Sequence, residues 1–135
     1  MLIDLTALSP SQIYHTMIQT VVPRPIAWVL SDNGDDSFNL APFSYFNAVS
    51  SRPPIVSLSI GLKKDGSDKD TRRNIKERSH FVIHIPHVEQ AQLVTDSAAA
   101  LAHGESEIAR LGFTDGGAGR FCSAAFAGLP GGLFL

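Results

Sequence analysis

The stretch PRPIAWVLSDNGDDSFNLAPFSYFN, residues 23–47, decides the fold. Residues 26–30 are apolar throughout, which is typical of a β-strand that is buried on both faces. The acidic cluster that follows contains Asn33-Gly34, a strong signal for a β-hairpin turn. Extended structure resumes at Phe38 and continues to Val49, with Pro42 marking a bulge or an edge position. The stretch therefore predicts two neighbouring antiparallel strands.

The second of these strands mixes two kinds of side chain. Asn39, Ser44 and Asn47 are small hydrogen-bonding residues, and they stand among phenylalanine and tyrosine. A plain hydrophobic core needs few such polar groups, whereas a binding site combines apolar walls with a few placed polar groups. This part of the sequence therefore predicts a surface for a polar, planar ligand.

Patterns elsewhere in the chain predict short helices and further strands. Ser9, Pro10 and Gln12 form a capping-box start for a helix, which Pro23 must end. Helices are also expected from Asp70 or Thr71 to Arg78, within residues 88–102 and within residues 105–111, and strands at residues 55–60 and 80–85. The chain is thus expected to be mainly β with short helices.

The composition limits the classes of function. The chain has 135 residues, of which 44% are hydrophobic and 18% charged, as in a globular domain. A net charge of −2 leaves no basic field for nucleic acid, and no apolar run approaches the roughly 20 residues that span a bilayer. The N-terminus lacks a signal-peptide pattern, and the single cysteine excludes an internal disulfide. We expect a cytoplasmic protein without nucleic-acid or membrane partners.

Two segments carry candidate anion-binding groups. Lys69, Thr71 and Asn74 lie at the start of a predicted helix, whose first turn offers free backbone N–H groups. The alternative for this segment is a capped helix that is solvated on the surface. Arg24 stands between two prolines, which order it in advance for binding an anion. Its alternative is an exposed arginine at an ordinary strand entry.

Three other patterns are weaker candidates for a functional site. His80, His84 and His87 have a spacing that could grip zinc on a helix, but the β-rich run around them favours a strand, so we expect no metal site. The glycine-rich residues 115–120 lack the Lys-Ser/Thr ending of a phosphate loop. Cys122 has no activating base nearby in the sequence.

Three blocks of sequence, in this order and spacing, resemble the flavin reductase-like, FMN-binding split-barrel family. They are VVPRPIAWV, NLAPFSYFNAVSSRPPIVSLSIG and KDTRRNI…HFVIHI, and the resemblance covers about residues 14–113. It implies a small antiparallel Greek-key split barrel that forms a homodimer, with flavin bound near the subunit interface. It also implies reduction of FMN or FAD by NAD(P)H, often for a partner oxygenase, although other members carry electrons.

The resemblance also implies a set of cofactor-binding residues. The segment from Asn39 to Asn47 would line the flavin ring and ribityl chain, and the Lys69 cluster, with Arg24, would hold the phosphate. The full set is Arg24, Asn39, Ser44, Tyr45, Phe46, Asn47, Lys69, Asp70, Thr71 and Asn74. FMN is the expected cofactor, with FAD as the alternative, and NAD(P)H the reductant. Because the hydride chemistry belongs to the flavin, no catalytic side chain is expected.

The resemblance ends near residue 113. Residues 1–113 are interpreted as a partial flavin reductase-like domain, and residues 114–135 as a divergent tail rich in glycine and alanine. The barrel is therefore expected to be incomplete at its C-terminal side, with the tail packing there without a regular ladder. Three functions remain open: an NAD(P)H-dependent flavin reductase, a non-catalytic FMN-binding electron carrier, or an inactive truncated fragment of a flavin reductase.

Overall fold

The computed structural model describes residues 2–99, 101, 105–112 and 124–127, the last four by their backbone alone. The helices are η1 (Leu5–Ala7), α1 (Pro10–Thr20), α2 (Asp70–Arg78), η2 (Val88–Gln90), α3 (Ala91–Asp96) and α4 (Glu107–Arg110), where η marks 3₁₀ turns. The strands are β1 (Ala27–Asp32), β2 (Phe38–Phe43), β3 (Phe46–Ser51), β4 (Pro54–Leu58), β5 (Val82–Ile85) and β6 (Ala124–Ala127).

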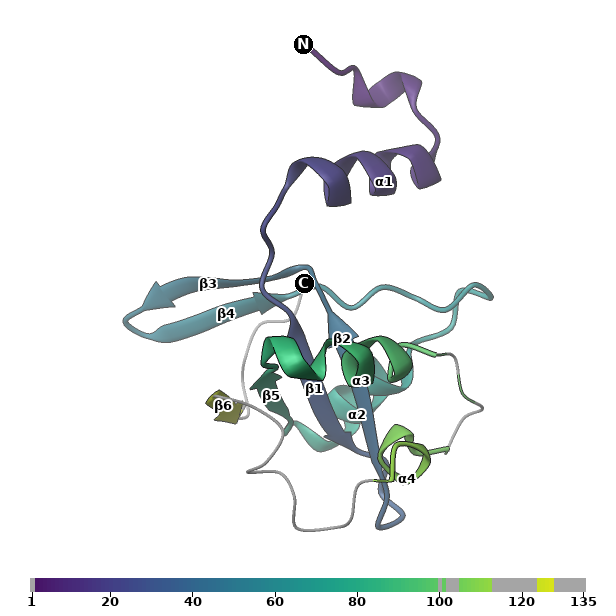
Figure 1. Cartoon of the computed structure of the whole chain (residues 1–135), viewed down its shortest axis with the longest axis vertical. Helices are drawn as coiled ribbons and strands as arrows, with labels where there is room; N and C mark the ends of the chain where they lie inside the picture. The colour runs from purple at the N-terminus through teal and green to yellow at the C-terminus, as the bar shows by residue number, and fades with distance from the viewer. Residues whose placement is uncertain (1, 100, 102–104, 113–123, 128–135) are drawn as a thin grey trace.

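The strands form two antiparallel sheets. The larger sheet has the order β2-β1-β5-β6, and β3 and β4 form a separate hairpin that extends from the body (Figure 1). The predicted hairpin between the first two strands is confirmed, with register pairs from Ala27↔Phe43 to Asp32↔Phe38. Pro42 lies in β2, an outer strand of the described sheet, where its missing N–H costs no ladder hydrogen bond.

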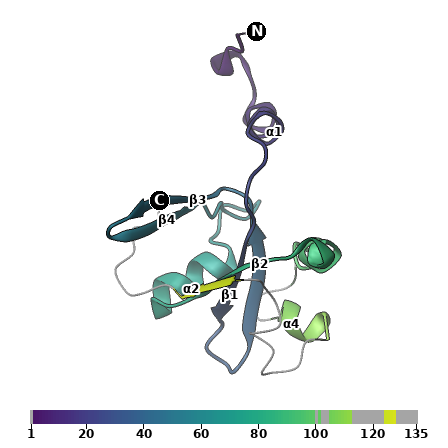
Figure 2. The ribbon, with the colours of Figure 1, turned by 60° about the vertical axis from the view of Figure 1, so that its left-hand side comes forward.

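Strand β1 is buried on both faces, as its apolar run predicts. Ala27 and Val29 pack with Ile75 of α2 on one face, and Trp28 packs with Leu40 on the other face, where α3 and α4 supply the remaining apolar contacts. Figure 2 shows α2 on one side of the β1–β2 pair and α4 on the opposite side. The core therefore has two layers of side chains that share the central strand.

Helix α1 stands away from the body (Figure 1). Its start confirms the predicted capping box, since the backbone N–H of Gln12 donates to Ser9 Oγ and that of Ser9 donates to Gln12 Oε1. None of its residues is buried. No helix in the described ranges is both long and apolar enough to cross a membrane.

Two expectations about the chain's local structure are wrong. Helix α2 has Lys69 at its N-cap with no side-chain cap, because the Asp70 carboxylate lies in the first turn and pairs with Lys63 instead. The second error concerns the tail: β6 forms an antiparallel ladder with β5, so these four residues do pair regularly. Residues 113–123 and 128–135, with Cys122 and the glycine-rich run, lie outside the described residues.

The short helix α4 supplies a buried carboxylate to β2. Glu107 is 7% exposed, and its Oε2 accepts a hydrogen bond from the backbone N–H of Leu40 at 3.0 Å. Desolvation raises the pKa of Glu107 and nearby Asp70 adds to the rise, while the bond from Leu40 and the charge of Arg110 oppose it. The folded protein therefore holds the Glu107 proton more tightly than the unfolded chain does.

Replacement of Glu107 should separate the hydrogen bond from the charge. Between the ordinary and the raised pKa the folded state binds more proton, so the free energy of unfolding should fall as pH rises through that window. Glu107→Gln keeps an acceptor for Leu40 without a buried charge, and it should flatten this slope without loss of stability at pH 7. Glu107→Ala should cost about 1–3 kcal/mol, because it leaves the Leu40 N–H unsatisfied.

Urea unfolding at several pH values measures both effects of the Glu107 variants. If Glu107→Gln is as destabilised as Glu107→Ala, the negative charge of Glu107, and not its hydrogen bond to Leu40, holds α4 on β2.

Candidate functional site

A pocket of about 690 Å³ lies between the end of α1 and the base of the β3–β4 hairpin. One wall consists of Met17 of α1, Val21 at the C-cap of this helix, and Arg24 in the segment before β1. The opposite wall consists of residues 44–47 and residues 57–59. Its volume lies within the range of about 300–1,000 Å³ that small-molecule sites occupy.

The chain reaches this pocket where it leaves the larger sheet. Strand β2 ends at Phe43, and Ser44 and Tyr45 form the turn before β3 begins at Phe46. The predicted contacts Ser44, Tyr45, Phe46 and Asn47 are therefore brought together with Arg24 around one pocket. These are the predicted residues that the structure gathers at one place.

The pocket combines apolar and hydrogen-bonding groups. Pro23, Phe46 and Leu58 are among its apolar lining residues. Over the described ranges, the side chains of Ser44, Asn47 and Ser59 form no hydrogen bond with protein groups. These polar side chains are therefore available to a ligand.

Sequence reasoning did not identify Met17, Val21, Ser57 and Ser59 as members of the pocket. Leu58, between the two serines, also lines the pocket, so strand alternation does not single out Ser57 and Ser59. Met17 and Val21 carry no local signal, since they reach the pocket only through the fold.

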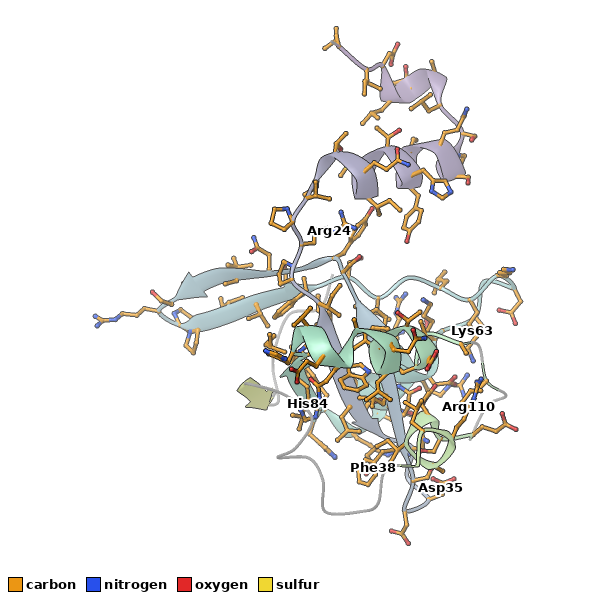
Figure 3. All side chains as sticks on the ribbon, in the orientation of Figure 1. Arg24, Asp35, Phe38, Lys63, His84 and Arg110 are labelled. Atoms are coloured by element: carbon orange, nitrogen blue, oxygen red, sulfur yellow. The ribbon has the colours of Figure 1, made fainter. Side chains whose placement is uncertain are left out.

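Arg24 lies between α1 and the hairpin (Figure 3). Its Nη1 donates to the carbonyl oxygen of Ile18 at 2.6 Å and also to that of Val21. Its Nε is buried and has no hydrogen-bond acceptor within the described chain. Arg24 thus lines the pocket, and its Nη1 binds carbonyl oxygens at the C-terminal end of α1.

Asn39, Thr71 and Asn74 lie in a buried polar network between α2 and the first hairpin. Asn39 Nδ2 donates to Thr71 Oγ1 at 2.8 Å, and Asn74 Nδ2 donates to Ser31 Oγ at 3.1 Å and to Asn33 Oδ1 at 2.8 Å. Thr71 is 1% exposed and Asn74 2%. The alternative of a fully solvated helix is therefore wrong for this face of α2. Asn39, Thr71 and Asn74 also do not line the pocket, although they were predicted to bind the cofactor.

Most charges around the start of α2 are paired. Asp70 lies 3.0 Å from Lys63 Nζ and 3.7 Å from Arg73 Nη1, and Asp68 pairs with Arg72 and Lys76. Lys69 differs, because its Nζ lies 5.6 Å from the centroid of the Phe43 ring, a cation–π arrangement. Phe43 is the last residue of β2 and directly precedes Ser44, which lines the pocket. The positive charge of Lys69 therefore lies beside the end of β2, where the chain reaches the pocket.

The histidines do not gather. His84 is buried in β5 opposite Trp28, and burial lowers its pKa, whereas His80 and His87 are exposed. In the part of the chain that the structure describes, no group of three histidine, cysteine or acidic side chains is placed to hold a metal ion. The burial of His84 exceeds what its sequence context predicts.

Comparison with known proteins adds a family match. The sequence profile described as "Flavin reductase like domain" matches residues 19–133. An uncharacterised protein of Halalkalibacterium halodurans is 38% identical over 109 residues, which are 81% of this chain and 52% of the relative. The profile match extends beyond residue 113, where the resemblance was expected to end, into residues 114–135.

Solved structures show the same likeness. Nitrilotriacetate monooxygenase component B from Bacillus cereus is 35% identical with a TM-score of 0.77, covering 83% of this chain and 55% of that one. A Shewanella frigidimarina protein with a split barrel domain, 16% identical with a TM-score of 0.68, covers 90% and 63%. The predicted mainly β split-barrel fold is confirmed, and the chain spans about half the length of the curated relatives it matches.

Proposed function

We propose that this chain, which belongs to the flavin reductase-like domain family, binds FMN in the pocket between α1 and the β3–β4 hairpin and acts as an NAD(P)H-dependent flavin reductase. The observation that carries the proposal is the convergence of Arg24 and residues 44–47 on a single pocket of suitable volume. The β1–β2 register, in which Ala27 pairs with Phe43, brings the segment before β1, with Arg24, next to residues 44–47, which follow β2.

The residues of the pocket suit the parts of a flavin nucleotide. Tyr45 and Phe46 offer aromatic surface to the flat ring. Asn47 and the pocket's serines offer hydrogen bonds to the pyrimidine edge and the ribityl hydroxyls. Lys69, beside Phe43, offers a positive charge to the phosphate.

Bound flavin supplies the hydride chemistry, and the protein supplies binding and orientation. The pocket lining, as far as the described residues define it, contains neither a carboxylate nor an imidazole. The lining residues offer hydrogen-bonding and apolar contacts that would bind and orient the reactants.

Preference for the phosphate is the first test. FMN should bind more tightly than riboflavin, and Lys69→Ala should weaken FMN binding about tenfold, the factor for a lost interaction of about 1.4 kcal/mol. The affinity for riboflavin should not change. Fluorescence titration of both flavins measures these constants, with Lys64→Ala, on the exposed loop, as the matched control. If the wild-type protein binds the two flavins with equal affinity, the proposal that it binds the phosphate group is wrong.

Thr71→Ala is not a suitable variant for this question. The Thr71 hydroxyl is buried and accepts the bond from Asn39, so its loss would weaken the attachment of α2 itself.

Oxidation of NADH or NADPH in the presence of FMN tests the reductase activity. Oxidation that depends on both the protein and the flavin supports the reductase. Binding of FMN without such oxidation indicates the electron carrier, and the absence of any flavin binding would contradict both functions.

We propose further that the chain works as a cytoplasmic homodimer and supplies reduced flavin to a partner oxygenase. The β3–β4 hairpin supports the dimer, because Val49, Ile55 and Val56 are 62%, 44% and 40% exposed, and an isolated two-stranded hairpin is only marginally stable in water. The name of the Bacillus cereus neighbour, a monooxygenase component, supports the partner. Co-purification with an oxygenase from the same organism tests the partner, and full transfer of reduced flavin without any association would contradict it.

A further inference from the structure

Helix α1 forms one wall of the pocket although none of its residues is buried. The ring of Tyr14 in α1 lies 6.2 Å from that of Tyr45, which lines the pocket. Within the described chain, the only hydrogen bonds between residues 9–21 and later residues are those from Arg24 Nη1 to Ile18 and Val21. The position of the α1 wall therefore depends strongly on one side chain.

Arg24 is well placed to hold this helix. Pro23 and Pro25 fix the backbone on either side of it, and the fully buried β1 begins at Ala27. The guanidinium meets the carbonyl oxygens at the C-terminal end of α1, where the helix dipole favours a positive charge. The arginine thus joins a rigid part of the body to the C-terminal end of an exposed helix.

We propose that Arg24 is a positioning residue that holds α1 beside the pocket through a clamp, namely the hydrogen bonds from its Nη1 to Ile18 and Val21. Loss of this clamp lets α1 move away from the pocket. Met17 and Val21 then move away from the ligand together, since both belong to the last turns and cap of the helix. The ligand-dependent part rests on the proposed flavin binding, whereas the clamp itself does not.

This role differs from direct recognition of the phosphate. If Arg24 bound the phosphate, its loss would weaken FMN binding and leave riboflavin binding unchanged. If Arg24 holds α1, its loss speeds the departure of FMN and riboflavin by the same factor, because both lose the same wall. The two flavins therefore distinguish the two roles.

The test uses Arg24→Met, which keeps an unbranched side chain and removes every donor. Hydrogen exchange of the ligand-free protein reports on the amides of residues 17–22, and stopped-flow measurements report on the dissociation of both flavins. We expect exchange and both dissociation rates to rise roughly tenfold, the factor for one lost charge-assisted hydrogen bond. Arg24→Lys, which keeps a charged donor at the helix end, should restore part of the effect.

Arg110→Met is the matched control, because Arg110 is exposed on α4, which supplies no lining residue of the pocket, and it should leave all these rates unchanged. Unchanged exchange in α1 of a folded Arg24→Met variant would overturn the clamp. Loss of FMN affinity alone would overturn the positioning role in favour of a phosphate contact. If the wild-type protein binds no flavin, the proposed function fails, and the exchange measurement still decides whether Arg24 holds α1.

Discussion

Trp28→Ala should lower the free energy of unfolding by about 3–5 kcal/mol, the usual cost of removing a buried aromatic side chain. Trp28 is 0% exposed and lies in the central strand, where it packs against Leu40 of β2. Its indole Nε1 also donates to Ser97 Oγ, just after α3, at 2.8 Å. The substitution removes the layer between β1 and α3, and total stabilities of such domains are only about 5–15 kcal/mol.

Trp28→Phe separates the two contributions of the side chain. It retains most of the apolar contact and leaves Ser97 without its donor, so it should cost less than Trp28→Ala. Chemical unfolding followed by circular dichroism gives both values. A cost below about 1 kcal/mol for Trp28→Ala would show that the α3 side of β1 contributes little to the fold.

Val56→Asp should convert the proposed dimer into a monomer. Val56 lies on β4 opposite Ala48 and is 40% exposed in the single chain. If a second chain covers the hairpin, the substitution buries an unpaired carboxylate at a cost of about 3–5 kcal/mol, which raises the dimer dissociation constant more than a hundredfold. Sedimentation velocity at micromolar protein concentration should show this change.

Val88→Asp is the matched control for the dimer test, since Val88 is 79% exposed in η2 and belongs to neither α1 nor the hairpin. It should leave the sedimentation unchanged. A wild-type chain that sediments as a monomer, or a Val56→Asp variant that remains a dimer, would rule out the hairpin as the subunit interface.

The sequence predicted those parts of the fold that depend on neighbouring residues. Ser9 and Gln12 identify the start of α1, and the uninterrupted apolar run before Ser31 identifies a strand that is covered on both faces. The hairpin turn is also local, and Gly34 adopts the positive φ of 89° that glycine permits at no cost.

The sequence could not predict contacts between distant segments. Asn39 and Thr71 are 32 residues apart, and only the packing of α2 on the sheet brings their side chains together. Glu107 has the local pattern of an exposed helical turn, yet it bonds to a backbone group 67 residues away. The pocket is similar: residues 44–47 were predicted as contacts, but the α1 wall depends on how the chain before Arg24 returns toward the hairpin.

The attachment of α4 has a consequence for how copies of this chain can meet. Ser106 Oγ donates to the carbonyl oxygen of Phe38, and Glu107 accepts from the N–H of Leu40, so two outward backbone groups of β2 are already occupied. An outer strand with free backbone groups is a template for pairing with another protein and for aggregation. Helix α4 therefore covers part of the edge of β2. Another chain is then expected to associate through side-chain contacts on other surfaces and not by pairing with β2.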